Sequence, residues 1–185
     1  MRKIKIGILG CAEIAKRMIV PNLLKTNKFE IVAFGSRSIK KATEYSNLFG
    51  GKPVEGYDEL IKIKEIEAVY IPLPTGLHFK WILKCLENKK HVFSEKSIAN
   101  NFTEVSKIIK IAKRNELCVY ENFMFPYHSQ IQFVNDLIKS NEIGEIRLLR
   151  SSFGFPIYNY DTNIRYKKKL GGGALLDAGA YNLMA

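Results

Sequence analysis

The sequence has few residues of the kinds that build covalent or metal-bound scaffolds. Its 185 residues include 3 cysteines and 3 histidines. They are scattered, with no Cys-x-x-Cys pair and no metal-ligand spacing, at Cys11, Cys85, Cys118, His78, His91 and His128. We therefore expect neither a disulfide framework nor a structural zinc site, and we predict no metal in the functional site. Unpaired thiols are typical of a reducing cytoplasm, which is the location we expect.

Long apolar runs are also missing. The longest have the length of β-strands, so we expect no membrane-spanning segment. Near the start, Arg2 and Lys3 precede an apolar run that ends at Cys11 and resembles a lipoprotein signal. Because Lys5 interrupts that run and its apolar core is too short for a signal peptide, we disfavour this alternative.

Negative charge is scarce, with 18 acidic residues against 29 lysines and arginines and a net charge of +11. Such an excess can indicate a nucleic-acid-binding protein. However, the lysines are spread along the chain, and the densest runs, residues 89–90 and 167–169, are short. Spaced lysines usually cover solvated helix faces, and the charge equally suits small anions such as nucleotides and sugar phosphates. Nucleic-acid binding stays an alternative.

Strand-like and helix-like segments alternate over the first two thirds of the chain. Apolar runs of strand length occupy residues 3–9, 30–34, 68–72, 91–93 and 117–120. Helical spacing occupies residues 11–24, 38–49, 75–86 and 102–115, with Ser38 and Thr75 as expected helix caps. Strands separated by helices of this length predict βαβ units, and hence a doubly wound parallel sheet of the Rossmann type over residues 1–121.

The pattern changes after Tyr120. Residues 131–138 read as a helix, and residues 145–153 alternate with period two, which predicts a half-exposed strand of a different, antiparallel or mixed sheet. An irregular stretch follows, and the glycines at 171–173 open another helix. Little chain remains to pair that strand, and an unpaired strand edge is a liability. We therefore expect residues 122–185 to be an incomplete second α/β domain.

The first strand ends in a turn with the features of a nucleotide site. It reads Gly7-Ile-Leu-Gly10-Cys-Ala12-Glu13-Ile14-Ala15, an apolar strand followed by a glycine turn and a helix start. In dinucleotide-binding domains such a turn brings backbone N–H groups and a helix N-terminus against the pyrophosphate. The usual fingerprint has glycine where this chain has Ala12 and Ala15, so the motif alone equally fits an ordinary buried strand–turn–helix.

The end of the second strand indicates which dinucleotide is bound. A carboxylate there holds the ribose 2′-OH of NAD, whereas an arginine accommodates the 2′-phosphate of NADP. This chain has Ser36, Arg37 and Ser38 there, with Lys40 and Lys41 next and no carboxylate. We therefore predict NADP(H) rather than NAD(H). The alternative is an exposed loop in which Ser38 only caps the next helix.

Two further strand ends carry candidate residues. The segment from Tyr70 to His78 contains Pro72 and Pro74, which stop the strand at the carboxyl edge of the sheet, where ligands bind. His78 alone fits a histidine on a helix surface equally well. Glu95 and Lys96 follow the strand at 91–93. A lysine desolvated beside a cofactor has a lowered pKa, which suits proton transfer, although Glu-Lys at a strand end is usually structural.

A last candidate pair lies near the end of the chain. Asp177 and Tyr181 are four residues apart, so they share one helix face, and the small residues 178–180 between them allow close packing. A tyrosine, an aspartate and a lysine together could deliver a proton to a carbonyl oxygen. The alternative is a surface aspartate beside a packed tyrosine.

Taken together, the segments resemble one family, the glucose-fructose oxidoreductase/inositol dehydrogenase (Gfo/Idh/MocA) oxidoreductases. The turn at 7–15, the GSRS segment at 35–38, the YIPLPTGLH segment at 70–78, the EKS segment at 95–97 and the LGGGALLDAGAY segment at 170–181 occur in the family's order. Residues 121–125, 128–130 and 143–147 most resemble the NADP-using sugar enzymes, including nucleotide-sugar 3-ketoreductases. Tyr181 also favours this branch, because the inositol branch has histidine there.

The resemblance implies an oxidoreductase that moves a hydride between nicotinamide and a sugar or nucleotide-linked ketosugar. It implies that Lys96 is the catalytic lysine, Tyr181 the proton donor and Asp177 a residue that orients the substrate. The cofactor-binding residues we predict from the motifs and the resemblance are Gly7, Gly10, Ala12, Glu13, Ile14, Ser36, Arg37, Ser38, Lys41, Leu73, Pro74, Thr75, His78 and Glu95.

The chain also departs from the family pattern. Ser97 replaces the proline of the family's E-K-P motif, and Pro126 stands where relatives usually have an arginine. Family members continue through a sheet that forms the substrate floor and the dimer interface, so a family-type homo-oligomer would lack most of its interface here. A catalytically inactive cofactor-binding remnant is therefore a second hypothesis, and a basic nucleic-acid binder a third.

Overall fold

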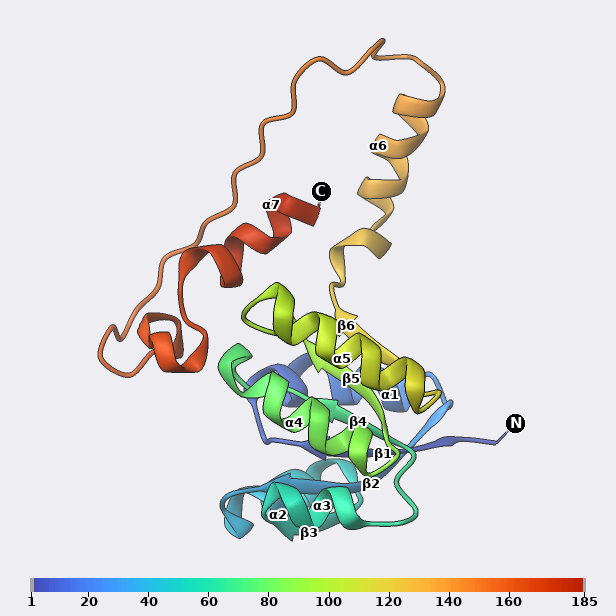
Figure 1. Cartoon of the computed structure of the whole chain (residues 1–185), viewed down its shortest axis with the longest axis vertical. Helices are drawn as coiled ribbons and strands as arrows, with labels where there is room; N and C mark the ends of the chain where they lie inside the picture. The colour runs from blue at the N-terminus through green and yellow to red at the C-terminus, as the bar shows by residue number, and fades with distance from the viewer. Residues whose placement is uncertain (1, 185) are drawn as a thin grey trace.

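The computed structural model describes residues 2–184, and a parallel six-stranded sheet is its centre (Figure 1). The strand order is β3-β2-β1-β4-β5-β6, and all neighbouring strands are parallel. The strands are β1 Ile4–Leu9, β2 Phe29–Ser36, β3 Lys52–Glu55, β4 Ala68–Ile71, β5 His91–Glu95 and β6 Val119–Asn122. This is the doubly wound Rossmann order, and its direction reverses between β1 and β4, where such sheets bind ligands.

Helices cover both faces of the sheet. They are α1 Val20–Lys25, α2 Ile39–Phe49, α3 Tyr57–Lys62, α4 Thr75–Glu87 and α5 Phe102–Arg114. On one face α3, α4 and α5 bury Leu60, Ile82 and Ile108 against the sheet. On the other face the first helix and α2 bury Val20 and Tyr45. Both faces of a parallel sheet are thus covered, which explains its nearly continuous apolar strands.

The structure confirms the predicted alternation and adds two elements that the sequence pattern did not reveal. β3 has 4 residues and α3 has 6, too short for a clear period. The helix expected over residues 11–24 is divided into a π-helix at Ala15–Ile19 and then α1, whose second residue, Pro21, lacks an amide hydrogen. Thr75 does not cap α4, because Pro74 holds the N-cap position.

The strand predicted at residues 145–153 is absent from the structure. After β6 the chain forms a 3₁₀ turn at Phe125–Tyr127 and α6 at Ser129–Lys139, and residues 145–153 then run extended without a ladder partner among residues 2–184. Leu148 and Leu149 are each 69% exposed. The pattern has the right period, but a strand forms only when another strand pairs with it.

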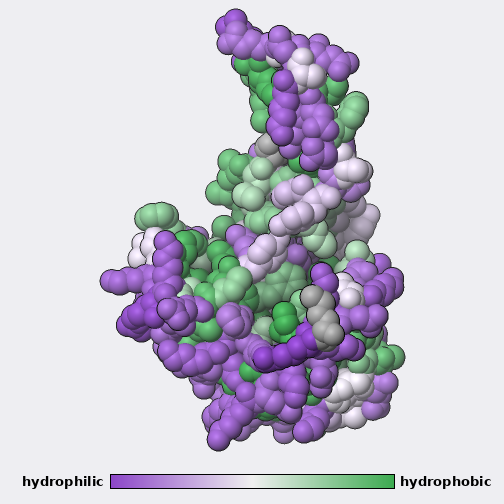
Figure 2. All heavy atoms as spheres, turned by 90° about the vertical axis from the view of Figure 1, so that its right-hand side faces the viewer, coloured by the Kyte–Doolittle hydropathy of each residue, from purple (hydrophilic) through white to green (hydrophobic). Residues whose placement is uncertain are grey.

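The last segment returns to the sheet (Figure 1). It contains 3₁₀ turns at Ile164–Tyr166 and Lys168–Leu170. The helix predicted after the glycines at 171–173 forms as a π-helix at Leu175–Gly179 followed by α7 at Ala180–Met184. Unlike the helices on the sheet, α6 buries none of its residues. Figure 2 shows apolar side chains exposed on the surface between the upper part of the molecule, which contains α6, and the sheet domain. No helix of residues 2–184 is long and apolar enough to cross a bilayer.

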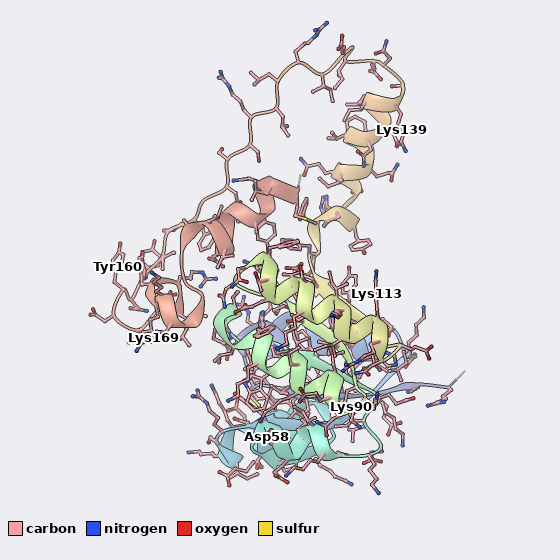
Figure 3. All side chains as sticks on the ribbon, viewed as in Figure 1. Asp58, Lys90, Lys113, Lys139, Tyr160 and Lys169 are labelled. Carbon is pink, nitrogen blue, oxygen red and sulfur yellow. The ribbon has the colours of Figure 1, made fainter. Side chains whose placement is uncertain are left out.

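The buried side chain of Lys90 stabilises the Rossmann domain through hydrogen bonds to backbone carbonyls (Figure 3). Its side chain is buried, and Nζ donates to the carbonyl oxygens of Ile66, at 2.6 Å, and Ile63, at 2.8 Å. We expect Lys90→Met to lower the free energy of unfolding by about 2 kcal/mol, because both carbonyls lose a buried donor. Urea denaturation measures this change. Lys110→Met, on the exposed face of α5, is the control and should change stability by less than about 0.5 kcal/mol.

Candidate active site

Two adjoining cavities lie along the carboxyl edge of the sheet. The larger has a volume of about 450 Å³ and the smaller about 220 Å³. Ala12, in the turn after β1, and residues 72–74, after β4, line both. The two cavities therefore form one groove at the point where the strand order reverses, which is the usual ligand site of this sheet.

The smaller cavity is suited to an anion. Its other lining residues are Gly10, Cys11, Ser36, Arg37, Ser38, Lys41 and Tyr57. Gly10 has φ +125°, a conformation that favours glycine, and its N–H donates to Gly35 O at 2.9 Å. Burial raises the pKa of the Cys11 thiol to about 11, so it stays neutral. Two cations and three hydroxyl-bearing side chains thus line a small cavity without an acidic side chain.

The larger cavity holds a charged cluster. Nζ of Lys96 lies 2.9 Å from Oδ1 of Asp177 and also donates to the Asp177 backbone oxygen. Nε of Arg165 donates to Oδ2 of the same carboxylate at 2.6 Å. Burial acts to raise the pKa of Asp177, but the hydrogen bonds and charges of Lys96 and Arg165 together hold it below its ordinary value. Asp177 is therefore an anion shared by two cations.

Tyr181 lies beside this cluster. The centre of its ring is 5.0 Å from Lys96 Nζ. Phe153 packs against the same ring at 5.1 Å between centroids and Phe123 at 5.5 Å. Burial raises the pKa of Tyr181, with smaller contributions from the charges of Glu95 and Asp177. The hydroxyl therefore keeps its proton near neutral pH, and the ammonium group of Lys96 lies over the ring that carries it.

Glu95 forms another wall of the larger cavity. The Tyr70 hydroxyl, on β4, and Nδ2 of Asn122, on β6, each donate to Glu95 Oε1 at 2.7 Å. These strands flank β5, so the carboxylate of Glu95 is held from both sides.

A third cavity of about 340 Å³ adjoins the larger one and shares Phe153, Phe155, Arg165 and Asp177 with it.

Comparison with known proteins identifies the family. Residues 4–123 match the model of the oxidoreductase family with an NAD-binding Rossmann fold (GFO_IDH_MocA), and residues 131–185 match the GFO/IDH/MocA C-terminal domain. The chain belongs to the Gfo/Idh/MocA oxidoreductase family.

The most similar relatives include sugar reductases. The chain is 42% identical to a dTDP-3,4-didehydro-2,6-dideoxy-alpha-D-glucose 3-reductase of Saccharopolyspora spinosa. The alignment spans 182 residues, which are 98% of this chain and 54% of the relative. The 3-ketoreductase KijD10 of Actinomadura kijaniata, in complex with NADP and TDP-benzene, superposes with a TM-score of 0.93 at 39% identity, over 97% of this chain and 55% of that one. The chain thus spans about half the length of these Gfo/Idh/MocA relatives.

The structure brings most predicted site residues of this Gfo/Idh/MocA chain to the groove. The larger cavity is lined by Ala12, Ile14, Leu73, Pro74, Thr75, Glu95, Lys96, Asp177 and Tyr181. The smaller cavity is lined by Gly10, Ala12, Ser36, Arg37, Ser38, Lys41, Leu73 and Pro74. Pro126 lies in the exposed turn at Phe125–Tyr127 and lines neither cavity.

Three predicted residues lie elsewhere. Gly7 is inside β1, where an added Cβ would lie 2.7 Å from Cδ1 of Ile66, so its lack of a side chain serves core packing rather than the turn. Glu13 is exposed and lines neither cavity. His78 is fully buried, and its ring nitrogens lie 2.7 Å from Ser97 O and 2.6 Å from Leu73 O. His78 thus contacts the two loops that line the groove rather than the groove itself.

Sequence reasoning missed several residues of the site, namely Tyr57, Tyr70, Asn122, Phe153, Phe155 and Arg165. Arg165 lies in an irregular stretch with no period, so no local pattern marks it. Tyr57 opens a helix that was itself not predicted. Tyr70 and Asn122 had usable signals. Tyr70 begins the candidate segment at 70–78, and Asn122 follows the last apolar strand and thus lies at the same carboxyl edge as Glu95.

Proposed function

We propose that the protein is an NADP(H)-dependent oxidoreductase that reduces the carbonyl group of a sugar or nucleotide-linked ketosugar, or oxidises the corresponding alcohol. The observation that carries this proposal is the cluster of Lys96, Asp177 and Tyr181 on one cavity, directly beside the nucleotide turn. We also propose that residues 1–121 form the cofactor domain and residues 122–185 part of the substrate domain. Cytoplasmic location and self-association stay predictions.

The smaller cavity fits the adenosine end of NADP. Arg37 and Lys41 supply positive charge, and the hydroxyls of Ser36 and Ser38 supply hydrogen bonds for a 2′-phosphate. Ser36 Oγ already accepts from Ser38 N–H at 3.2 Å, which fixes the loop. KijD10 was crystallised with NADP, which supports the same assignment. When bound, the cofactor would supply the hydride at nicotinamide C4.

The chain's own residues would manage the proton. Tyr181 would donate its hydroxyl proton to the carbonyl oxygen, and Lys96, held by Asp177, would stabilise the tyrosinate that forms. Asn122 and Tyr70 would keep Glu95 against the cofactor side of the cavity. KijD10 has also been crystallised with a lysine replaced by glutamate and with a tyrosine replaced by phenylalanine. The choice of these two residue types for replacement in KijD10 agrees with the lysine and the tyrosine proposed here.

The cavity that adjoins the reacting cluster suits a nucleoside diphosphate group. Arg165 offers positive charge, and its guanidinium lies 5.3 Å from the ring centre of Phe155. An aromatic face and a cation are the side chains that bind a base and phosphates. The relative from Saccharopolyspora spinosa is a reductase of a dTDP-linked sugar, and KijD10 was crystallised with TDP-benzene, which supports this substrate class.

Turnover tests the proposal. A mixture of the chain, NADPH and a dTDP-linked 3-ketosugar is expected to lose nicotinamide absorbance. NADPH binding without loss of absorbance on any sugar of a panel would instead support a cofactor-binding protein without catalysis. Binding of DNA with a steep salt dependence, and no NADPH binding, would support the nucleic-acid alternative.

Arg37 should decide which dinucleotide is bound. We expect Arg37→Ala to weaken NADPH binding about 10- to 100-fold and NADH binding about twofold or less, because a charged hydrogen bond contributes about 1.5–3 kcal/mol. Titration of the intrinsic protein fluorescence measures both constants. Lys40→Ala is the control, since Lys40 is exposed and does not line the smaller cavity. An equal loss for both dinucleotides would contradict the assignment of the 2′-phosphate.

A further inference from the structure

Ser97 lies between three parts of the site. It follows Lys96 at the carboxyl end of β5, and it is 9% exposed. Its carbonyl oxygen lies 2.7 Å from Nδ1 of His78, a buried residue of α4. Its hydroxyl donates to the backbone oxygen of Leu176 at 2.9 Å. The residue therefore links α4, the end of β5 and the returning C-terminal segment.

The Ser97 hydroxyl donates to a carbonyl oxygen of a π-helical turn. Leu176 belongs to the π-helix Leu175–Gly179, and side chains from the Rossmann domain donate to two consecutive carbonyls of this turn. Ser97 donates to Leu176 O, and Lys96 donates to Asp177 O. A π-helical turn has looser internal bonding than an α-helix and often occurs at functional sites. The turn that carries Asp177 is thus held by neighbouring residues, one neutral and one charged.

The position of Tyr181 depends on the same turn. Tyr181 lies in α7, which continues directly from the π-helix, and its ring is 5.0 Å from Lys96 Nζ. The charged bond from Lys96 can follow a moving carboxylate because the lysine side chain is long and flexible. The Ser97 side chain is short, and the backbone oxygen of the same residue is in hydrogen-bond contact with His78. Its bond therefore fixes the distance between the lysine and the tyrosine more strictly.

We infer that Ser97 is a positioning residue, whose hydroxyl docks the Leu175–Gly179 turn on the end of β5 and thereby aligns Tyr181 with Lys96. The consequence for the reaction rests on the function proposed above, whereas the docking itself does not. Loss of one buried neutral hydrogen bond changes a local opening equilibrium about fivefold to tenfold. This is the size of effect to be expected.

The test compares three variants of the full chain. Ser97→Ala removes the hydroxyl, Ser97→Thr keeps one, and Ser46→Ala is the matched control. Ser46 is also 9% exposed, but its hydroxyl has no partner among the described residues and lies in α2. Hydrogen–deuterium exchange of residues 175–184 with NADPH bound is the first measurement. The kcat for ketosugar reduction and the Kd for NADPH are the second.

In Ser97→Ala we expect exchange of residues 175–184 to be about fivefold to tenfold faster, kcat to fall by a similar factor and the NADPH Kd to change less than twofold. Ser97→Thr should restore most of the parent exchange rate and most of the parent kcat. Ser46→Ala should change neither the exchange of residues 175–184 nor kcat. Unchanged exchange in Ser97→Ala overturns the inference, whatever the turnover. Faster exchange throughout the sheet, or faster local exchange with an unchanged kcat, also overturns it. If the parent chain lacks turnover, the proposed reaction fails, and the exchange result still decides the docking.

Discussion

Lys96→Met is expected to lower kcat about 10²- to 10³-fold and to leave the NADPH Kd within about threefold. Methionine has a similar length but no charge, so the tyrosinate formed at Tyr181 would lose the cation now 5.0 Å from its ring. The Asp177 carboxylate would keep Arg165 as a partner, which limits the structural damage. Stopped-flow or steady-state loss of nicotinamide absorbance measures the rate, and fluorescence titration measures binding.

Lys113→Met is the control for this variant. Lys113 lies in the last turn of α5, exposed and away from the groove (Figure 3). Its replacement should leave kcat and Kd unchanged. Thermal unfolding of both variants shows whether either loses the fold. A folded Lys96→Met variant that keeps the parent rate would refute the role given to the lysine, and equal losses in both variants would point to the overall charge.

Gly76→Ala is expected to abolish most activity, by at least about 10²-fold, while the Rossmann domain stays folded. An added Cβ would lie 2.7 Å from Leu170 C, 2.7 Å from Lys169 O and 2.8 Å from Gly171 N. These are backbone atoms, so the turn at Lys168–Leu170 must move away from α4, and the segment with Asp177 and Tyr181 moves with it. Alanine in a first helical turn does not itself weaken α4, because its helix propensity exceeds that of glycine.

Trypsin provides a readout for this displacement that does not need turnover. Residues 167–169 are lysines beside the N-terminal end of α4 (Figure 3). Their cleavage should be faster in Gly76→Ala than in the parent chain. Gly154→Ala is the matched control, since a Cβ at Gly154 meets no atom within 4 Å. Unchanged cleavage and unchanged kcat in Gly76→Ala would show that this close contact does not determine the site.

The sequence by itself determined five of the six strands of the sheet and most of the groove. The apolar strands, the intervening helices and the glycine at the first turn are local signals. In a parallel sheet all strands end at one edge, so the residues after each strand must gather there. This rule predicted Pro74 and Lys96 at the cavity where the structure has them, and the dinucleotide-binding pattern of the first two strands predicted Ala12 and Arg37 there.

Only the tertiary structure decided how the C-terminal segment completes the site. Arg165 lies opposite Asp177, and Gly76 lies against Gly171, through contacts between segments that are far apart or irregular, and such contacts have no periodic signature. The same holds for Gly7, which lies inside β1 against Ile66, and for His78, which is buried behind the groove. Residues 145–153 have the strand period but lack a partner, so their pattern alone does not make a strand. Local pattern sets which conformation a segment prefers, and long-range packing decides what it contacts.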